Sequence, residues 1–282
     1  MILFKKADDV HAYLAKIIES GKQIGFVPTM GALHEGHISL IKASNQSNLL
    51  SVCSIFVNPA QFNDTKDFDN YPSTIEQDID ALEKAGCAVL FLPSVSEMYP
   101  TGTKNAKNYD LGYLELFLEG SFRPGHFQGV CLVVQRLLQI IPAHTLYLGQ
   151  KDYQQCMVIK RLIELENINT HIYICPTLRE KDGLAMSSRN MRLSATERAQ
   201  AIKIFETLSF LKAQIKPGDL TQLKQTAIKK LSDAGFRVDY VEIADAGNLE
   251  ILDQWDGSQR TVALAAAFLG QVRLIDNLLL QP

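Results

Sequence analysis

The sequence lacks the features that mark exported, membrane-spanning and disulfide-stabilised proteins. Its first residues, MILFKKADDVHAYLAKI, contain no uninterrupted apolar stretch of the kind found in signal peptides, so no export is expected. No segment has the ~20 largely uncharged apolar residues that a membrane-spanning helix needs. The five cysteines are scattered and never stand in CxxC spacing. We therefore expect buried free thiols and a cytoplasmic protein with no membrane partner.

The sequence also lacks an excess of charge of either sign. The formal net charge is −3 and the pI is near 6.1, which gives no electrostatic footprint for nucleic acid. An anionic ligand would therefore have to be held by local groups. Hydrophobic residues make up 46% and charged residues 21%, as in ordinary globular proteins, and a length of 282 residues favours two unequal domains.

Apolar runs rich in Val, Ile and Phe alternate with segments of helical period along the first part of the chain. This alternation predicts an α/β fold with a Rossmann-like, doubly wound parallel sheet. The strands are expected at residues 23–27, 50–57, 88–92, 145–148 and 171–175, and the helices at 36–47, 74–85, 128–140 and 153–166. Ligands bind at the carboxyl ends of such strands, so the loops that follow them are the places to search for chemistry.

The pattern changes after Thr177. A polar loop is followed by helical periodicity at residues 195–214 and 220–234, and then by the short strand patterns VDYVEIAD, TVALAAAFL and VRLID. We therefore predict a catalytic domain over residues 1–176 and a second, smaller α+β lid domain over residues 177–282, with a hinge near Pro176.

The segment PTMGALHEGH, at residues 28–37, follows the first expected strand. Its glycines permit close backbone approach, and His34 and His37 stand three residues apart at the start of a helix. A helix amino end favours anions, and imidazole donors can bond to phosphate oxygens, so we hypothesise phosphate binding here. Two exposed loop histidines are the plain alternative. A zinc site is disfavoured because the metalloprotease pattern HExxH places its histidines four apart.

Three later loops carry further polar groups. FVNPAQF, at residues 56–62, offers neutral amides that suit a hydroxy acid, although an Asn-Pro turn is the favoured explanation of this motif by itself. LGQKDYQQ, at residues 148–155, places a lysine where it could neutralise phosphate charge, or where it is simply solvated beside a capped helix. In TLREKDGLAMSSRN, at residues 177–190, hydroxyls and an arginine could hold a triphosphate, and a polar surface loop is the alternative.

Taken together, the motifs PTMGALHEGH, FVNPAQF, LEGSFRPGHFQGV, LGQKDYQQ and GLAMSSRN, in this order, resemble those of the pantothenate synthetases. The resemblance spans the whole sheet domain. Two of these elements are also similar to the paired signatures of class I aminoacyl-tRNA synthetases. The resemblance implies an ATP-dependent ligase in which pantoate attacks the α-phosphate of ATP, pyrophosphate leaves, and β-alanine attacks the pantoyl adenylate.

The resemblance also implies roles for individual residues. Catalytic roles fall on His34, His37, Lys151 and Arg189. Substrate-binding roles fall on Asn58, Gln61 and Gln155. The ATP-binding residues would be Met30, Gly31, Ala32, Leu33, His34, Glu35, Gly36, His37, Gly149, Gln150, Lys151, Asp152, Leu178, Met186, Ser187, Ser188 and Arg189. Mg²⁺ would accompany ATP without a protein metal cage, no tightly bound organic cofactor would be needed, and the family implies a homodimer.

Five positions depart from the pattern typical of this family. They are Ala60, Ser73, Gln128, Ala143 and Gln150, and none removes a group with a direct role. Three other functions stay open: an enzyme that stops after nucleotidyl transfer, a synthetase-like RNA binder, and a catalytically silent nucleotide-binding protein. The absence of a basic stripe disfavours the second, and the retained His34, His37, Lys151 and Arg189 disfavour the third.

Overall fold

The chain forms two compact units in a computed structural model that describes residues 1–47, 49–62, 72, 74–103 and 107–280. The first unit comprises Met1–Gly149 and Gln154–Pro176, and the second comprises Gln150–Tyr153 and Thr177–Pro282. The short segment Gln150–Tyr153 therefore makes its contacts with the C-terminal part of the chain. The lid role expected for residues 177–282 stays a prediction.

The first unit is built on a parallel sheet of six strands in the order β1-β4-β3-β2-β5-β6. The strands are β1 (Ile2–Phe4), β2 (Ile24–Thr29), β3 (Leu50–Ile55), β4 (Val89–Phe91), β5 (Thr145–Gly149) and β6 (His171–Cys175). The chain leaves β2 toward β3 and β4 and then returns to β5 and β6, so the order reverses beside β2. The predicted α/β, doubly wound fold class is confirmed.

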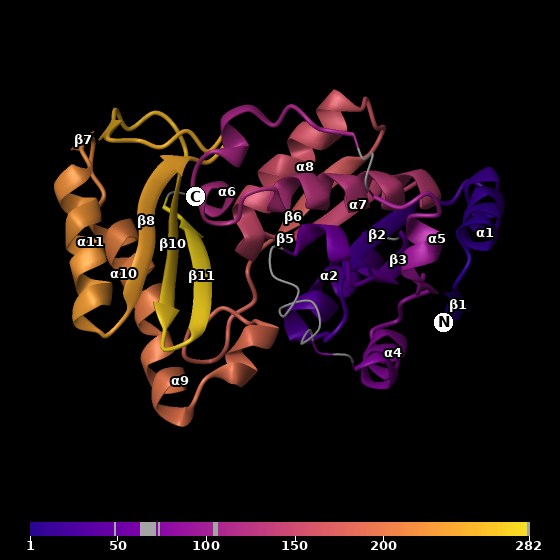
Figure 1. Cartoon of the computed structure of the whole chain (residues 1–282), viewed down its shortest axis with the longest axis horizontal. Coiled ribbons are helices and arrows are strands. Elements are labelled where there is room, and N and C mark those ends of the chain that lie inside the picture. The colour runs from indigo at the N-terminus through magenta and orange to yellow at the C-terminus, as the bar shows by residue number, and fades with distance from the viewer. Residues whose placement is uncertain (48, 63–71, 73, 104–106, 281–282) are drawn as a thin grey trace. The chain divides into compact units, whose positions relative to one another are not determined.

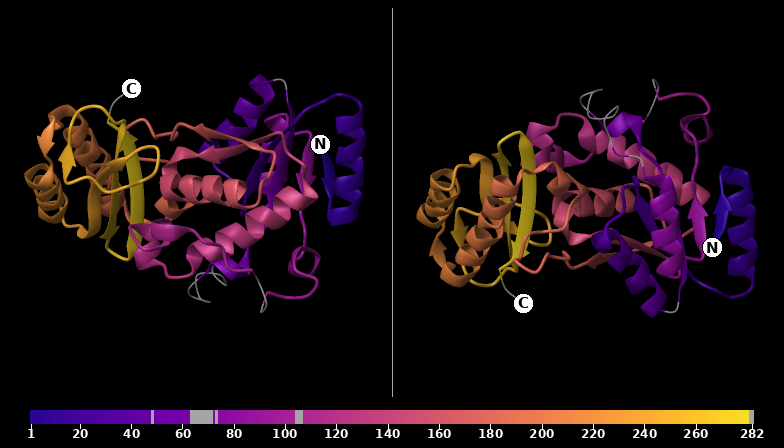
Figure 2. Two further views of the ribbon diagram at one scale, coloured as in Figure 1. Left: turned by 90° about the horizontal axis from the view of Figure 1, so that it is seen from above. Right: turned by 90° about the horizontal axis from the view of Figure 1, so that it is seen from below.

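Helices cover both faces of this sheet, as Figures 1 and 2 show. Right-handed crossovers place α2 (Glu35–Gln46) and α4 (Ile75–Lys84) on one face, and α1 (Ala7–Glu19), α7 (His126–Ile140) and α8 (Tyr153–Leu165) on the other. The shorter helices are α5 (Val95–Met98) and α6 (Glu119–Phe122). The buried core between α2, α4 and the sheet includes Val27, Ile41, Leu82 and Leu90.

The second unit contains an antiparallel sheet in the order β11-β10-β8, formed by β8 (Arg237–Asp245), β10 (Thr261–Leu269) and β11 (Val272–Leu279). Helices α10 (Lys203–Gln214) and α11 (Thr221–Asp233) pack on this sheet around Leu208, Leu231 and Val241. A minor sheet pairs β7 (Gly218–Asp219) with β9 (Gln254–Trp255). Among the described residues of either unit, no helix combines the length and apolar character needed to cross a membrane.

Most predicted elements occur within one or two residues of their expected ends. The helix predicted at 195–214 is instead two helices, α9 (Ala195–Ala201) and α10, which meet at Ile202. Ile202 keeps near-helical φ −59° and ψ −23°, and its carbonyl accepts from Glu206 N at 3.0 Å. The break is thus a single interrupted turn. Strand β1 and helix α1 were not among the predicted elements.

The five cysteines are free and buried. Burial raises the pKa of the Cys87 thiol to about 11 and that of the Cys131 thiol to about 12. These two side chains are therefore protonated near neutral pH, which makes them poor nucleophiles.

Candidate functional site

The loop between β2 and α2 is held in shape by a buried carboxylate. Asp78 on α4 is 2% exposed and accepts hydrogen bonds from the backbone N–H groups of Ala32, at 3.0 Å, and Leu33, at 2.8 Å. Gly31 and Ala32 both have positive φ, +85° and +50°. The glycine suits this conformation, and the two hydrogen bonds that Asp78 accepts offset the strain at the alanine.

Asp78 was absent from the predicted site, although its sequence pattern carried a signal. It stands on the same face of α4 as Ile75, Ile79 and Leu82, where an apolar residue is expected. A carboxylate on the apolar face of a helix has to find donors in the core. The sequence signals such a need but cannot say that the donors are the backbone of residues 32 and 33.

The substitution Asp78→Ala is expected to lower the free energy of unfolding by about 3 kcal/mol, because two buried N–H groups lose their acceptor. Denaturant unfolding followed by fluorescence would measure it. Asp80→Ala is a matched control on the same helix, since the Asp80 side chain is 61% exposed and pairs with Lys84 on the surface. The control is expected to change stability by less than ~0.5 kcal/mol. Equal stability of the two variants would contradict a supporting role for Asp78.

His34 and His37 form the amino-terminal cap of α2. The Nδ1 atom of His34 accepts from Gly36 N at 3.1 Å, and the Nδ1 atom of His37 accepts from His34 N at 3.3 Å. The ring centroids lie 4.1 Å apart. Because both Nδ1 atoms accept, a neutral ring at either position carries its proton on Nε2 and can donate from it. The predicted pair is thus brought together at a helix amino end.

This arrangement bears on the zinc alternative. Among the residues that the structure describes, no group of three or more His, Cys, Asp or Glu side chains is placed to hold a metal ion. The Nδ1 atoms of both histidines are already hydrogen-bonded to backbone N–H groups. The geometry therefore favours imidazoles that donate to an anion over imidazoles that ligate a metal.

Asn58 and Gln61 lie at the carboxyl end of β3, around the short helix η1 (Pro59–Gln61). Asn58 is fully buried, accepts from Tyr99 OH at 2.8 Å and donates to Gly129 O at 3.0 Å and to Gln61 Oε1 at 3.2 Å. The Nε2 of Gln61 lies 3.0 Å from the sulfur of Met30. The structure therefore brings Gln61 next to the first predicted ATP loop, and it gives Asn58 an orienting role toward Gln61.

Helix α7 fixes η1 from the other side. Gly129 allows the close approach, because a Cβ at this position would collide with the carbonyl oxygen of Ala60. One turn earlier, His126 Nδ1 lies 2.9 Å from Gln61 O. The motif LEGSFRPGHFQGV therefore supports the Gln61 backbone, a function that its sequence alone does not reveal.

Two neighbouring glutamines of α8 differ in their surroundings. Gln154 is 4% exposed and holds the chain before α6, donating to Leu114 O at 2.8 Å and Phe117 O at 2.9 Å. The predicted substrate ligand Gln155 is half-buried. The structural role of Gln154 was not predicted, because the sequence does not show which of two adjacent glutamines lies on the buried face of the helix.

In the second unit, the side chains of Lys151, Ser187 and Arg189 line one pocket together with Arg273 and Asp276. Lys151 belongs to the 3-10 turn η3 (Gln150–Asp152), and Ser187 caps η4 (Ser188–Arg192) by accepting from Arg189 N at 3.3 Å. Two motifs 36 positions apart in the chain, at 151 and 187, thus meet. Arg273 is paired with Asp239 at 2.7 Å, and Asp276 is paired with Arg179 at 2.7 Å. The net positive charge around this pocket therefore comes from Lys151 and Arg189, and it suits an anion.

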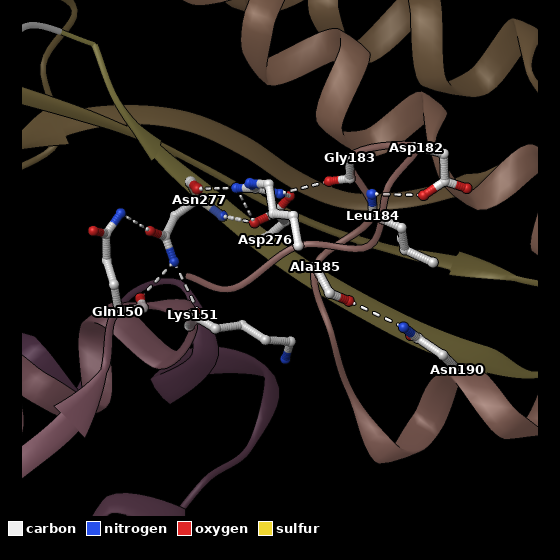
Figure 3. Close-up of polar contacts among 10 residues, drawn as sticks. Gln150, Lys151, Asp182, Gly183, Leu184, Ala185, Asn190, Asp276 and Asn277 are labelled. Carbon is white, nitrogen blue, oxygen red and sulfur yellow. Dashed lines mark hydrogen bonds and ion pairs between the residues drawn. The ribbon is translucent and has the colours of Figure 1, made fainter. Parts of the chain in front are cut away.

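The loop before η4 is a short two-stranded turn. Met186 N donates to Leu178 O at 3.0 Å, and Arg179 pairs with Ala185 as an antiparallel bridge. Asn190 Nδ2 closes the loop by donating to Ala185 O at 3.0 Å, as Figure 3 shows. Leu178 and Met186, both predicted as nucleotide contacts, are thus direct neighbours.

The structure shows the surroundings of four of the five positions that depart from the family pattern. Gln128 bonds to both the N–H and the C=O of Tyr109 at 2.9 Å, Ala143 is buried, and Ala60 meets Gly129 on α7. Gln150 donates to Asn277 Oδ1 at 3.1 Å. Ser73 lies outside the described residues.

The predicted site residues thus fall into two groups, one in each unit. The first group contains Met30, Gly31, Ala32, Leu33, His34, Glu35, Gly36, His37, Asn58, Gln61, Gly149 and Gln155. The second contains Gln150, Lys151, Asp152, Leu178, Met186, Ser187, Ser188 and Arg189. That residues of both groups bind one ATP molecule stays a prediction.

Comparison with known proteins identifies relatives over the full length of the chain. Residues 2–279 match the Pantoate-beta-alanine ligase family. Pantothenate synthetase from Cytophaga hutchinsonii is 44% identical over 283 residues, covering 99% of each chain. The crystal structure of pantothenate synthetase from Thermus thermophilus superposes with a TM-score of 0.91 at 36% identity, covering 100% of both chains. A pantoate-beta-alanine ligase from Francisella tularensis, solved with beta-gamma ATP and beta-alanine, has a TM-score of 0.81 at 39% identity, covering 99% of this chain and 98% of the other.

Proposed function

Because the chain belongs to the pantoate-beta-alanine ligase family, we propose that it joins pantoate to β-alanine with the cleavage of ATP to AMP and pyrophosphate. The observation that carries this proposal is the full-length match to relatives of that activity, one of which was solved with an ATP compound and β-alanine. In the first step the pantoate carboxylate attacks the α-phosphorus of ATP and pyrophosphate leaves. In the second, the amine of β-alanine attacks the acyl carbon and AMP leaves.

The first step demands stabilisation of negative charge that develops on phosphate oxygens. His34 and His37 supply Nε2–H donors at the amino end of α2, where the helix dipole adds a favourable field. Lys151 and Arg189 supply positive charge, and Ser187 supplies a hydroxyl group, for the leaving pyrophosphate. ATP enters as its magnesium complex, so the ion belongs to the substrate. No protein nucleophile is required, because ATP already provides the activated phosphoryl group.

The hydroxy acid is held by neutral amides. Gln61 and Gln155 bind the hydroxyl and carboxylate groups of pantoate. Asn58 positions Gln61 by donating to its Oε1 atom. Asn58 is support rather than a direct ligand, since its oxygen and its nitrogen each have partners inside the protein. A neutral pocket avoids fixing the pantoate carboxylate in an ion pair that would weaken it as a nucleophile.

The proposed function is tested by measuring AMP release from ATP, magnesium, pantoate and β-alanine, with each component omitted in turn. Release that requires every component, with pantothenate confirmed by mass spectrometry, is the expected result. Pyrophosphate exchange that needs pantoate and ATP but not β-alanine would identify the adenylate intermediate. A stable nucleotide conjugate without turnover to AMP would instead favour an enzyme that stops after nucleotidyl transfer.

We also propose that the protein is a homodimer associating through the first unit. Four large apolar side chains are exposed in one stretch of this unit: Tyr113, Leu116, Phe117 and Phe122, the second of them 67% exposed. Exposed apolar residues gathered in this way are typical of protein interfaces. Light scattering at several concentrations is expected to give the dimer mass, and Leu116→Asp with Phe117→Asp to give the monomer. A monomer mass for the wild-type protein at every concentration would contradict the proposal.

We propose a cytoplasmic location. Five free and buried cysteines support it, because a reducing compartment keeps such thiols unpaired.

A further inference from the structure

Two consecutive residues of β11 connect the turn η3, which carries Lys151, to the loop that carries Ser187 and Arg189. Asp276 and Asn277 lie on β11 and are 2% and 1% exposed. Neither belongs to a motif that carried the functional prediction. Their side chains make contacts with the turn that carries Lys151 and with the loop that carries Ser187, as Figure 3 shows for the labelled residues.

Asn277 binds the backbone of the Lys151 turn. Its Nδ2 donates to Gln150 O at 2.9 Å and to Lys151 O at 2.8 Å, and its Oδ1 accepts from Gln150 Nε2 at 3.1 Å. Two carbonyl acceptors require the donor end of the amide on that side, so this orientation is fixed by chemistry. Both carbonyls belong to η3. The turn is therefore bound to β11 at Lys151, the residue that also lines the pocket.

Asp276 binds the other loop through a buried ion pair. Arg179 donates to its two carboxylate oxygens at 2.7 and 3.0 Å, and also to Gly183 O and Asn277 O, each at 3.1 Å. The guanidinium lies 4.1 Å from the ring centroid of Phe205. Arg179 precedes the turn that leads to Ser187 and Arg189, and its bridge to Ala185 fixes the return strand of that turn. The bidentate pair thus sets the position of the loop relative to β11.

We propose that Asp276 and Asn277 are positioning residues for the nucleotide step, holding the Lys151 turn and the Ser187–Arg189 segment at a fixed separation. This inference rests on the proposed function and deepens it. Asp276 of β11 lines the same pocket as Lys151, Ser187 and Arg189. Strand β11 is therefore the element that fixes where the cationic groups lie. Charge complementarity is kept because Arg179 neutralises Asp276, which leaves Lys151 and Arg189 available to a polyanion.

The alternative is that these contacts only stabilise the second unit. The two roles differ in which kinetic constants they affect. A positioning role predicts damage to adenylate formation, which uses the triphosphate, and none to the attack of β-alanine on an adenylate already formed. A purely stabilising role predicts that both half-reactions fall together in proportion to the folded fraction.

The test compares Asn277→Ala with the wild-type protein in two half-reactions. We expect the KM for ATP in pyrophosphate exchange to rise about 10-fold, because two hydrogen bonds to the turn are lost. The rate at which β-alanine consumes preformed enzyme-bound pantoyl adenylate is expected to stay within about 2-fold of wild type. Calorimetric titration with ATP provides a second readout that needs no turnover.

A control variant in the same unit separates positioning from stability. Lys224→Met breaks the ion pairs that the buried lysine makes with Glu242 and Asp253, at 2.9 and 2.6 Å, elsewhere in the second unit. It is expected to lower the unfolding midpoint without raising the KM for ATP.

Each outcome decides the proposal. A selective loss in pyrophosphate exchange and in ATP affinity for Asn277→Ala supports it. Equal loss in both half-reactions, or the same kinetic pattern in Lys224→Met, would overturn it. Unchanged ATP binding would also overturn it. If the wild-type protein binds ATP but forms no pantoyl adenylate, the proposed function fails, while the titration of Asn277→Ala with ATP still decides whether the residue positions the nucleotide loops.

Discussion

Replacing His37 with alanine is expected to slow adenylate formation by about 10²- to 10³-fold, the usual loss when one donor to a developing oxyanion is removed. The expectation rests on the Nε2–H group that a neutral His37 carries when its Nδ1 accepts from His34 N. Pyrophosphate exchange and single-turnover AMP formation would measure the loss. The KM for β-alanine is expected to stay unchanged, because the residue acts before β-alanine enters the reaction.

The same side chain also caps α2, so alanine removes two functions at once. His37→Gln separates them. Glutamine is the usual residue at the third position of a capping box and can accept from His34 N, which preserves the cap. His37→Ala is therefore expected to lose about 1 kcal/mol of stability and His37→Gln much less, while both lose activity. Full activity in His37→Gln would contradict a requirement for the imidazole, because the glutamine amide keeps the cap and offers an N–H donor of its own.

The sheet of the first unit was predictable because its signals are local. A strand such as His171–Cys175 lies between Thr170 and Pro176 and carries β-branched and aromatic side chains, and its observed ends match the prediction. Strand β1, with three residues, is too short to show a period, and α1 begins without a side-chain cap at Lys6. The interruption at Ile202 is invisible in the sequence, because the apolar spacing continues through it.

The site was predictable to the extent that its residues stand in motifs. His34 and His37 are close in sequence, so their meeting in space required only a helix start. Lys151 and Ser187 lie in different motifs and were connected through resemblance, and the structure brings them to one pocket.

The supporting residues could not be found in this way. Asp78, Asn277 and Gly129 act on backbone atoms of segments at least 45 positions away in the chain, and a backbone acceptor or donor leaves no mark in a sequence. Asn277 in particular stands at the end of a strand pattern that reads as ordinary sheet. Contacts of this kind depend on tertiary packing, and no periodicity or spacing rule encodes them.

Replacing Lys151 with methionine is expected to lower kcat/KM for ATP in adenylate formation by about 10³-fold, since a cation beside the triphosphate is removed at nearly constant side-chain volume. The fold is expected to be retained, because Asn277 binds the backbone carbonyl of Lys151 and not its side chain. Lys151→Arg is expected to recover part of the loss, as the charge is kept with a different donor geometry. Lys203→Met, which breaks an exposed pair with Glu206, is the matched control and should keep wild-type kinetics.

The Lys151 variant also shows how Asn277 acts. If Asn277 serves the nucleotide step by aligning Lys151, then adding Asn277→Ala to Lys151→Met should weaken ATP binding by much less than it does in the wild-type background. Calorimetric titration of the four proteins in this cycle measures the coupling without turnover. Additive effects would mean that Asn277 works through another group on the turn or on the Ser187 loop. Full kcat/KM in Lys151→Met alone would instead remove the lysine from the proposed chemistry and leave Ser187 and Arg189 as the groups that receive the pyrophosphate charge.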